Sequence, residues 1–315
     1  NCIIQDKHGF MWFATYGGLN KYDGYSFTVY QNDENDSTSI GSNINEVLFE
    51  DSEGFIWIVN NGNGGLDKFD PESGIFYHYK HDPKDPASIS SSTVNYVMQD
   101  KSGNIWVCTN NALNLAVHEK GNRGAKTTFK RFMSPSGNNF VRAYEDSKGN
   151  LLLFSKNLYY FDRQTNTFTA SIQLPNERII SFCEDKKQNI FVSTQTAGVF
   201  KLEWDNNSSR YKLGDNAKIN PAPKNRCCVT IDNFGMLWIG TETKGLFRFN
   251  PETEQMVNFV PDKLDPRSLS DGNIYSLRVD RSGVLWIGTY SQGLCKYDLY
   301  RKDFALFKSI PGNIN

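Results

Sequence analysis

The sequence has almost no net charge, because 34 lysines and arginines are balanced by 35 acidic residues among 315. Nucleic-acid binding relies on a basic surface that displaces counterions, so it is not expected of this chain. No run approaches the roughly 18 apolar residues of a membrane-spanning helix, and no basic-then-apolar leader opens the chain, so we expect no membrane segment here. Aromatic residues are abundant at 14%, which excludes disorder and predicts a globular, β-rich protein.

Motifs for metal binding and catalysis are also missing. The six cysteines are scattered without C-x-x-C spacing, so zinc and dithiol sites are not supported. Most of them fall in apolar, strand-like runs, which favours buried free thiols, while disulfides and the redox compartment stay open. The sequence contains no H-E-x-x-H, no G-x-S-x-G and no phosphate-binding glycine loop. We expect no metal, no cofactor and no catalytic residue, although 35 acids leave a glycosidase-like carboxylate pair open.

A unit of the form Asp-x-x-Gly-x-x-Trp recurs along the chain at intervals of 39 to 49 residues. Its five full copies are Asp6–Gly9–Trp12, Asp51–Gly54–Trp57, Asp100–Gly103–Trp106, Asp232–Gly235–Trp238 and Asp280–Gly283–Trp286. Two weaker copies begin at Asp146 and Asp185 and place Leu152 and Phe191 where the others have tryptophan. Seven equivalent aspartates cannot converge on one substrate, so we interpret them as turn residues that bond their own following amides. The tryptophans are expected to fill the gaps between neighbouring units.

Each unit contains four short segments with the pattern of β-strands. An alternating apolar run precedes the aspartate, as at 94–99, and a second strand follows it, as at 56–59. A Gly-Leu step starts the third strand, as at 245–249, and an aromatic segment forms the fourth, as at 304–307. Four antiparallel strands in about 45 residues make one propeller blade, which cannot bury both its faces alone. The sequence therefore predicts an all-β fold, a seven-bladed β-propeller of four-stranded antiparallel blades.

The expected boundaries make residues 1–315 a single domain. Its blades are expected near residues 1–40, 41–89, 90–136, 137–175, 176–222, 223–270 and 271–312. The closing Asn313-Ile314-Asn315 repeats Asn43-Ile44-Asn45, so residues 313–315 are expected to complete blade 1 and bring the chain ends together. Alternatively, these residues begin another propeller in a longer parent. Because its first residue falls inside an expected strand, we expect the chain to be a fragment.

The segments from Asp232 to Leu246 and from Asp280 to Leu294 resemble the two-component regulator propeller repeat, whose pattern is close to V-x-x-I-x-x-D-x-x-G-x-L-W-I-G-T-x-x-G-L. The resemblance extends over the whole chain, with blades 4 and 5 as the poorest matches. It implies the periplasmic sensor region of a Bacteroides-type hybrid two-component system, whose usual signal is an oligosaccharide. The parent would add a second propeller, an immunoglobulin-like domain, a membrane helix, a histidine kinase, a receiver and an AraC-type DNA-binding domain.

What the resemblance implies for this chain is binding without chemistry. Histidine kinase activity would belong to the parent, and this propeller would be a ligand sensor or a scaffold. Its partners would be an oligosaccharide, the neighbouring propeller, the immunoglobulin-like domain and a second copy in a homodimer. Two other functions stay open on the residues alone, a propeller glycosidase or lyase and a ring used purely for protein interaction.

Ligand contacts are expected in the loops between the second and third strands, which all open on one face of the predicted ring. Their amides, aromatic rings and few charges suit carbohydrate hydroxyls. The candidates are Tyr16, Asn60, Asn61, Asn63, Asn110, Asn111, Lys156, Gln195, Glu242, Lys244, Tyr290 and Gln292. Three arginines near inner-strand starts, Arg142, Arg178 and Arg226, are further candidates, as a cluster that would grip sulfated or uronic-acid glycans. Alternatively, each arginine is solvated or paired internally.

Overall fold

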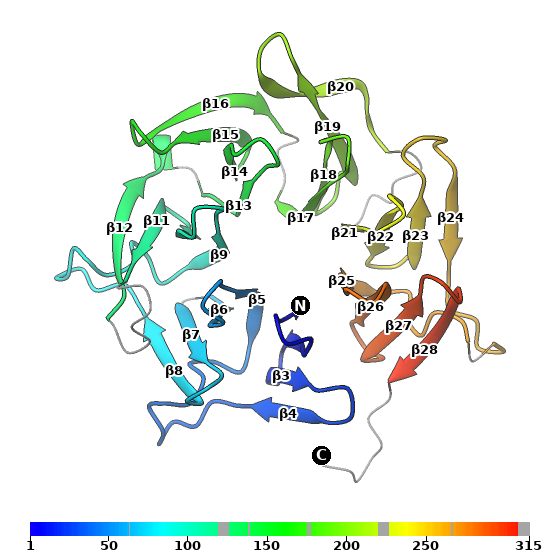
Figure 1. The fold of residues 1–315 in the computed structure, drawn as a ribbon, viewed down its shortest axis with the longest axis horizontal. Coiled ribbons are helices and arrows are strands. Elements are labelled where there is room, and N and C mark those ends of the chain that lie inside the picture. Colours follow the sequence, from blue (N-terminus) through cyan, green and yellow to red (C-terminus); the bar gives the residue numbers. More distant parts are fainter. Residues whose placement is uncertain are drawn as a thin grey trace. The chain divides into compact units, whose positions relative to one another are not determined.

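The chain folds as a seven-bladed β-propeller, seen in a computed structural model that describes residues 1–62, 64–118, 126–137, 139–174, 178–219, 227–265 and 267–307. Each blade is a four-stranded antiparallel sheet whose strands follow one another in chain order (Figure 1). The predicted fold class is therefore confirmed. The segment 313–315, predicted to complete blade 1, lies outside the described residues.

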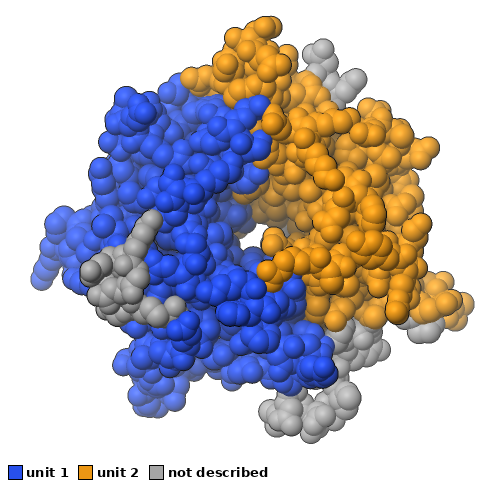
Figure 2. All heavy atoms as spheres, viewed as in Figure 1, with its two compact units in different colours: residues 1–170 blue, residues 171–315 orange. Residues whose placement is uncertain are grey.

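Two compact units make up the chain, residues 1–170 and residues 171–315, drawn in blue and orange in Figure 2. Whether all seven blades close into one domain stays a prediction. The first four sheets belong to unit 1, and the last strand of the fourth runs across the boundary.

Blade 1 consists of β1 (Cys2–Gln5), β2 (Met11–Thr15), β3 (Gly18–Tyr22) and β4 (Phe27–Tyr30). Blade 2 consists of β5 (Asn45–Glu50), β6 (Ile56–Asn60), β7 (Leu66–Asp70) and β8 (Ile75–Tyr79). Blade 3 consists of β9 (Val94–Gln99), β10 (Ile105–Thr109), β11 (Ala112–Val117) and β12 (Thr128–Met133). Blade 4 consists of β13 (Arg142–Glu145), β14 (Leu151–Phe154), β15 (Asn157–Asp162) and β16 (Thr167–Gln173), after a short 3-10 helix at Pro135–Gly137.

Unit 2 holds the remaining three blades. Blade 5 consists of β17 (Ile179–Glu184), β18 (Ile190–Thr194), β19 (Val199–Asp205) and β20 (Arg210–Lys218). Blade 6 consists of β21 (Cys227–Ile231), β22 (Leu237–Thr241), β23 (Leu246–Phe249) and β24 (Met256–Phe259). Blade 7 consists of β25 (Ile274–Val279), β26 (Val284–Thr289), β27 (Leu294–Asp298) and β28 (Asp303–Phe307). Within each unit, the first strand of a blade packs beside the first strand of the next blade (Figure 1).

The hydrophobic core lies between neighbouring sheets, and the repeated tryptophan is its largest member. Trp12 stacks on Tyr30 of its own blade at a ring distance of 6.0 Å and meets the edge of Phe69 in the next blade at 5.9 Å. In unit 2, Trp238 repeats this arrangement with Phe259 at 5.8 Å and Tyr297 at 5.3 Å. Such aromatic pairs add to the free energy gained from burying apolar surface. For Trp12 and Trp238, the prediction that the tryptophans fill the gaps between blades is confirmed.

The Gly-Leu step at the third strand has a steric cause. Gly245 adopts a φ of +80°, and a Cβ added there would lie 2.2 Å from the carbonyl oxygen of Phe259 on the fourth strand. Only glycine accepts both this backbone conformation and this close approach. The step therefore sets where the third strand begins and how long the preceding loop is.

Candidate functional site

The repeated aspartate is fully engaged by its own turn. Asp51 Oδ1 accepts hydrogen bonds from the backbone N–H groups of Glu53 and Phe55, both at 3.0 Å, and Oδ2 accepts one from Trp57 Nε1 at 2.7 Å. The same tryptophan bond, at 2.7 to 2.8 Å, recurs in Asp6–Trp12, Asp100–Trp106, Asp232–Trp238 and Asp280–Trp286. These carboxylates hold the Asp-x-x-Gly turn against the second strand. The structural interpretation of the repeated aspartates is confirmed, and the tryptophan donor is a role that the sequence did not reveal.

Blades 4 and 5 lack the tryptophan and replace its donor with an amide. Asn150 Nδ2 donates to Asp146 Oδ2 at 2.8 Å, and Asn189 Nδ2 donates to Asp185 Oδ2 at the same distance. Each asparagine stands four residues after its aspartate, in the two repeats that have no tryptophan. A buried carboxylate oxygen without a donor is costly, so an alternative donor is needed there. Asn104 makes the same bond to Asp100 at 3.0 Å beside Trp106, so the asparagine by itself does not mark a blade without tryptophan.

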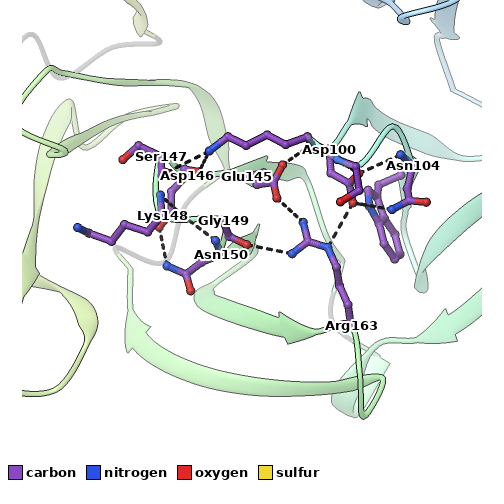
Figure 3. Close-up of polar contacts among 12 residues, drawn as sticks. Asp100, Asn104, Glu145, Asp146, Ser147, Lys148, Gly149, Asn150 and Arg163 are labelled. Atoms are coloured by element: carbon purple, nitrogen blue, oxygen red, sulfur yellow. Dashed lines mark hydrogen bonds and ion pairs between the residues drawn. The ribbon is translucent and has the colours of Figure 1, made fainter.

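A polar cluster joins blades 3 and 4 and is also structural (Figure 3). Arg163 Nε lies 3.2 Å from Asp100 Oδ2, and its terminal nitrogens donate to Glu145 Oε1 at 2.9 Å and to the Gly149 carbonyl at 3.0 Å. Burial pulls the pKa of Asp100 upward, but hydrogen bonds from Trp106 and Asn104 and the charge of Arg163 outweigh it and hold the pKa below its usual range. The cluster is a closed set of paired charges, suited to holding two blades together.

A second edge of the sheets repeats its backbone geometry while its side chains differ from blade to blade. The inner strands of four blades contain a one-residue bulge at the same repeat position, where the register with the second strand skips a residue. The bulged residues are Glu46, Asn95, Ile180 and Tyr275. A bulge leaves one residue unpaired and re-aims its side chain, and bulges are common beside functional sites.

The loop after the second strand closes over each bulge by the same backbone bond. The N–H of the first loop residue donates to the carbonyl of the residue two before the bulged one, at 2.9 to 3.3 Å. The bonded pairs are Asn61–Ile44, Asn110–Thr93, Gln195–Arg178 and Tyr290–Asn273. We call the four bulged residues and these four loop residues the bulge–loop edge. Its backbone repeats while its side chains differ from blade to blade.

Two blades show direct side-chain contact across this edge. Asn61 Nδ2 donates to Glu46 Oε1 in blade 2. In blade 7, the rings of Tyr275 and Tyr290 are stacked with centroids 5.4 Å apart and an interplanar angle of 27°. The bulged residues were not among the sequence candidates, because a single-residue skip leaves no mark in the hydrophobic pattern.

The candidates in unit 1 are placed differently from one another. Asn61, Asn110, Lys156 and Tyr16 are exposed, the last with 60% of its surface accessible. Asn60 is fully buried and accepts a hydrogen bond from Asn45 Nδ2 at 2.9 Å, so its side chain braces the strand end and does not face solvent. The half-buried Asn111 donates to the Ser90 carbonyl at 3.3 Å. Asn63 lies outside the described residues.

Arg142 of unit 1 has internal partners. One terminal nitrogen donates to the Val141 carbonyl at 2.7 Å, and the guanidinium lies 5.2 Å from the centre of the Tyr96 ring. In unit 2, Arg178, Gln195, Lys244, Gln292 and Tyr290 are exposed and Glu242 is half-buried. Arg226 lies outside the described residues, so an arginine cluster stays a prediction, as does ligand binding by every candidate.

The six cysteines, all of them described, are free thiols, and burial raises the pKa of Cys108 to about 12. Within the described ranges, no three histidine, cysteine or acidic side chains are grouped as metal ligands would be. The same ranges contain no helix with the length and apolar character needed to cross a bilayer.

Comparison with known proteins identifies the repeat. Residues 88–111 and 268–291 match the family described as two component regulator propeller. These two segments match the two-component regulator propeller repeat. A stretch of 38 residues is 55% identical to histidine kinase P4 of Formosa agariphila. This stretch is 12% of this chain and 3% of that protein.

Nearly the whole chain is similar in fold to solved structures. The extracellular domain of a proposed hybrid two component system from B. thetaiotaomicron is 18% identical with a TM-score of 0.56, covering 99% of this chain and 43% of that one. Virginiamycin B lyase from Staphylococcus aureus is 13% identical with a TM-score of 0.69, covering 97% and 94%. At these identities the likeness shows the fold alone. The chain thus spans 43% of the length of that extracellular domain.

Proposed function

We propose that this propeller is the extracytoplasmic sensor part of a hybrid two-component signalling protein and that it binds an oligosaccharide through bulge–loop residues within one unit. The observation that carries the proposal is the contrast between the two turn edges of the sheets. At the Asp-x-x-Gly turns, the repeated carboxylates are engaged in hydrogen bonds within their own blades. At the bulge–loop edge, one repeated backbone presents amide, acidic, aliphatic and aromatic side chains in turn.

This arrangement suits recognition of a ligand with many hydroxyl groups. Amide side chains both donate and accept hydrogen bonds, and tyrosine adds a flat ring, so together they match a sugar surface. The backbone bonds that tie Asn61, Gln195 and Tyr290 to the inner strands fix the loops in advance. Binding then loses little conformational entropy.

Signal transfer would follow from a difference in affinity. A ligand shifts an equilibrium between two arrangements of a dimer only by binding one of them more tightly. In the parent, the neighbouring propeller, the immunoglobulin-like domain and a second protomer would supply those arrangements, and the kinase would report them. The family match and the similar extracellular domain support this assignment.

The test is a panel of oligosaccharides screened against the chain by thermal shift and then by calorimetry. We expect at least one glycan to raise Tm and to give a saturable heat. The same incubations are assayed for new reducing ends and unsaturated products. Silence across the panel would contradict the sensor proposal, and turnover would replace it with an enzyme.

A further inference from the structure

We propose that the stacked rings of Tyr275 and Tyr290 in blade 7 form the platform on which one pyranose ring of the ligand lies. The inference rests on the proposed function and assigns its aromatic contact to one blade. Tyr290 has 63% of its surface exposed although it stacks on Tyr275, so part of its ring is open to a ligand. The C–H face of a pyranose is apolar and packs on such a ring, while its hydroxyls stay free for hydrogen bonds.

The loop that carries Tyr290 is fixed at each residue. The Tyr290 N–H donates to the Asn273 carbonyl at 3.0 Å. Ser291 donates from its backbone and hydroxyl to Asp271 Oδ2 at 3.1 and 2.8 Å, and the Gln292 N–H donates to Thr289 Oγ1 at 3.1 Å. An exposed aromatic ring on a loop held this firmly is preorganised, so stacking a sugar on it does not first have to order the loop.

Polar groups lie beside the platform. The Asn273 Oδ1 atom is buried and has no hydrogen-bond partner among the described residues, which is unfavourable unless a donor reaches it. Gln292 is exposed two residues after Tyr290 and offers both donors and acceptors. Gln292, in the same loop, is the amide side chain open to the hydroxyl groups of a sugar lying on Tyr290.

The other bulged blades do not repeat this aromatic pair. The corresponding pairs are Glu46 with Asn61, Asn95 with Asn110, and Ile180 with Gln195. Tyr16 stands at the position of Tyr290 in blade 1 and is equally exposed at 60%, but no stacked aromatic partner is recorded for it among the described residues. Because Tyr16 is itself a candidate contact, the control is Tyr25, which is 98% exposed in the turn between β3 and β4.

The experiment uses the glycan that binds best in the panel and measures its Kd by calorimetry for the wild-type chain and for four variants. Tyr290→Ala and Tyr275→Ala should each weaken binding about tenfold or more, because the first removes the ring and the second its support. Tyr290→Phe should keep most of the affinity, since it retains the stacking face. Tyr25→Ala, at an exposed tyrosine outside these loops, should change Kd less than about twofold.

Saturation-transfer NMR on the wild type gives an independent readout, since the ring protons of the sugar should receive magnetisation from tyrosine. Thermal unfolding of each variant shows that it is folded. Wild-type binding with unchanged Kd in folded Tyr290→Ala and Tyr275→Ala would overturn the platform and leave the sensor function standing. The absence of any glycan binding by the wild type would overturn both.

Discussion

Asn150 donates its side-chain amide to Asp146 at 2.8 Å and so takes the place that the tryptophan indole holds in five other blades. Replacing Asn150 with Ala removes this donor from a carboxylate that has no exposed surface. We expect a loss of about 1 to 3 kcal/mol in the free energy of unfolding, measured by urea denaturation. Asn104→Ala is the matched control, because Asp100 keeps Trp106 and Arg163 as donors. Equal losses in the two variants would contradict the donor role.

Gln188 stands where six repeats have glycine, and it adopts a positive φ of 66°. A side chain in this region of backbone space is strained. Gln188→Gly should therefore raise the free energy of unfolding by up to about 1 kcal/mol, after the entropy cost of glycine is subtracted. The reverse change at the equivalent position, Gly149→Ala at a φ of +86°, should lower it, since nothing but backbone strain opposes the added Cβ. Chemical denaturation of both variants checks the pair, and a stabilising Gly149→Ala would refute the explanation.

His78 joins the fourth strand of blade 2 to the loop before β5. Its Nδ1 lies 2.7 Å from Asp67 Oδ1, and its Nε2 lies 3.1 Å from the Ser37 carbonyl. The hydrogen bond with Asp67 raises the pKa of His78 above its usual value, outweighing burial and the charge of Lys80, which lower it. The stabilisation is therefore complete below the unfolded pKa of about 6.5 and is lost as pH rises through the higher folded pKa.

The stability difference between the wild type and His78→Gln should accordingly be larger at about pH 6 than at about pH 8.5. Thermal unfolding across this range measures it. The control is Arg131→Gln in blade 3, because Arg131 donates to the Asp85 and Ser88 carbonyls at 2.8 Å from the corresponding position and is not a histidine. Its effect should be independent of pH. If the stability difference between the wild type and His78→Gln did not change with pH, His78 would be excluded as the source of the pH dependence.

Arg163 pairs with two carboxylates whose side chains are 0% and 9% exposed, Asp100 and Glu145. Arg163→Met leaves both charges without their cation, so we expect a loss of about 1 to 3 kcal/mol in the free energy of unfolding. Arg301→Met is the comparison, because its arginine is 80% exposed and should contribute less than about 1 kcal/mol. Urea titrations of the two variants at the same ionic strength distinguish them. A loss at Arg301 as large as that at Arg163 would argue against burial as the cause.

The repeat itself carries most of the information about the fold. The spacing of Asp6, Gly9 and Trp12 occurs in seven copies of the unit, two of them weaker, and predicts seven four-stranded sheets. The aspartate and the glycine of the unit determine the turn between two strands of a sheet. The tryptophan's size indicates a gap between sheets. Its indole N–H is invisible in a hydrophobic pattern, so the bond to the aspartate and its replacement by Asn150 could be found only from the structure.

The candidate site was predicted less completely, for reasons of register. The second strand of blade 2 extends to Asn60, one residue beyond the expected end, and that residue turns inward. Tyr275 was overlooked because it sits in an alternating run that reads as a regular strand, and only the skip between Ile274 and Ser276 re-aims it. The loop residues Asn61 and Tyr290 are exposed as expected, because a loop position stays at the surface whatever the strand register, and their binding role stays a prediction.

The bulges make the position of each loop independent of the side chains that the loop carries. The bonds from Asn61, Asn110, Gln195 and Tyr290 to the inner strands use backbone atoms only, so the side chains at these positions can change without loosening the loop. A combinatorial library that varies only the bulged residue and its loop neighbour in each blade would therefore sample new specificities on an unaltered scaffold. The same independence would let related propellers diverge in specificity while their cores stay interchangeable.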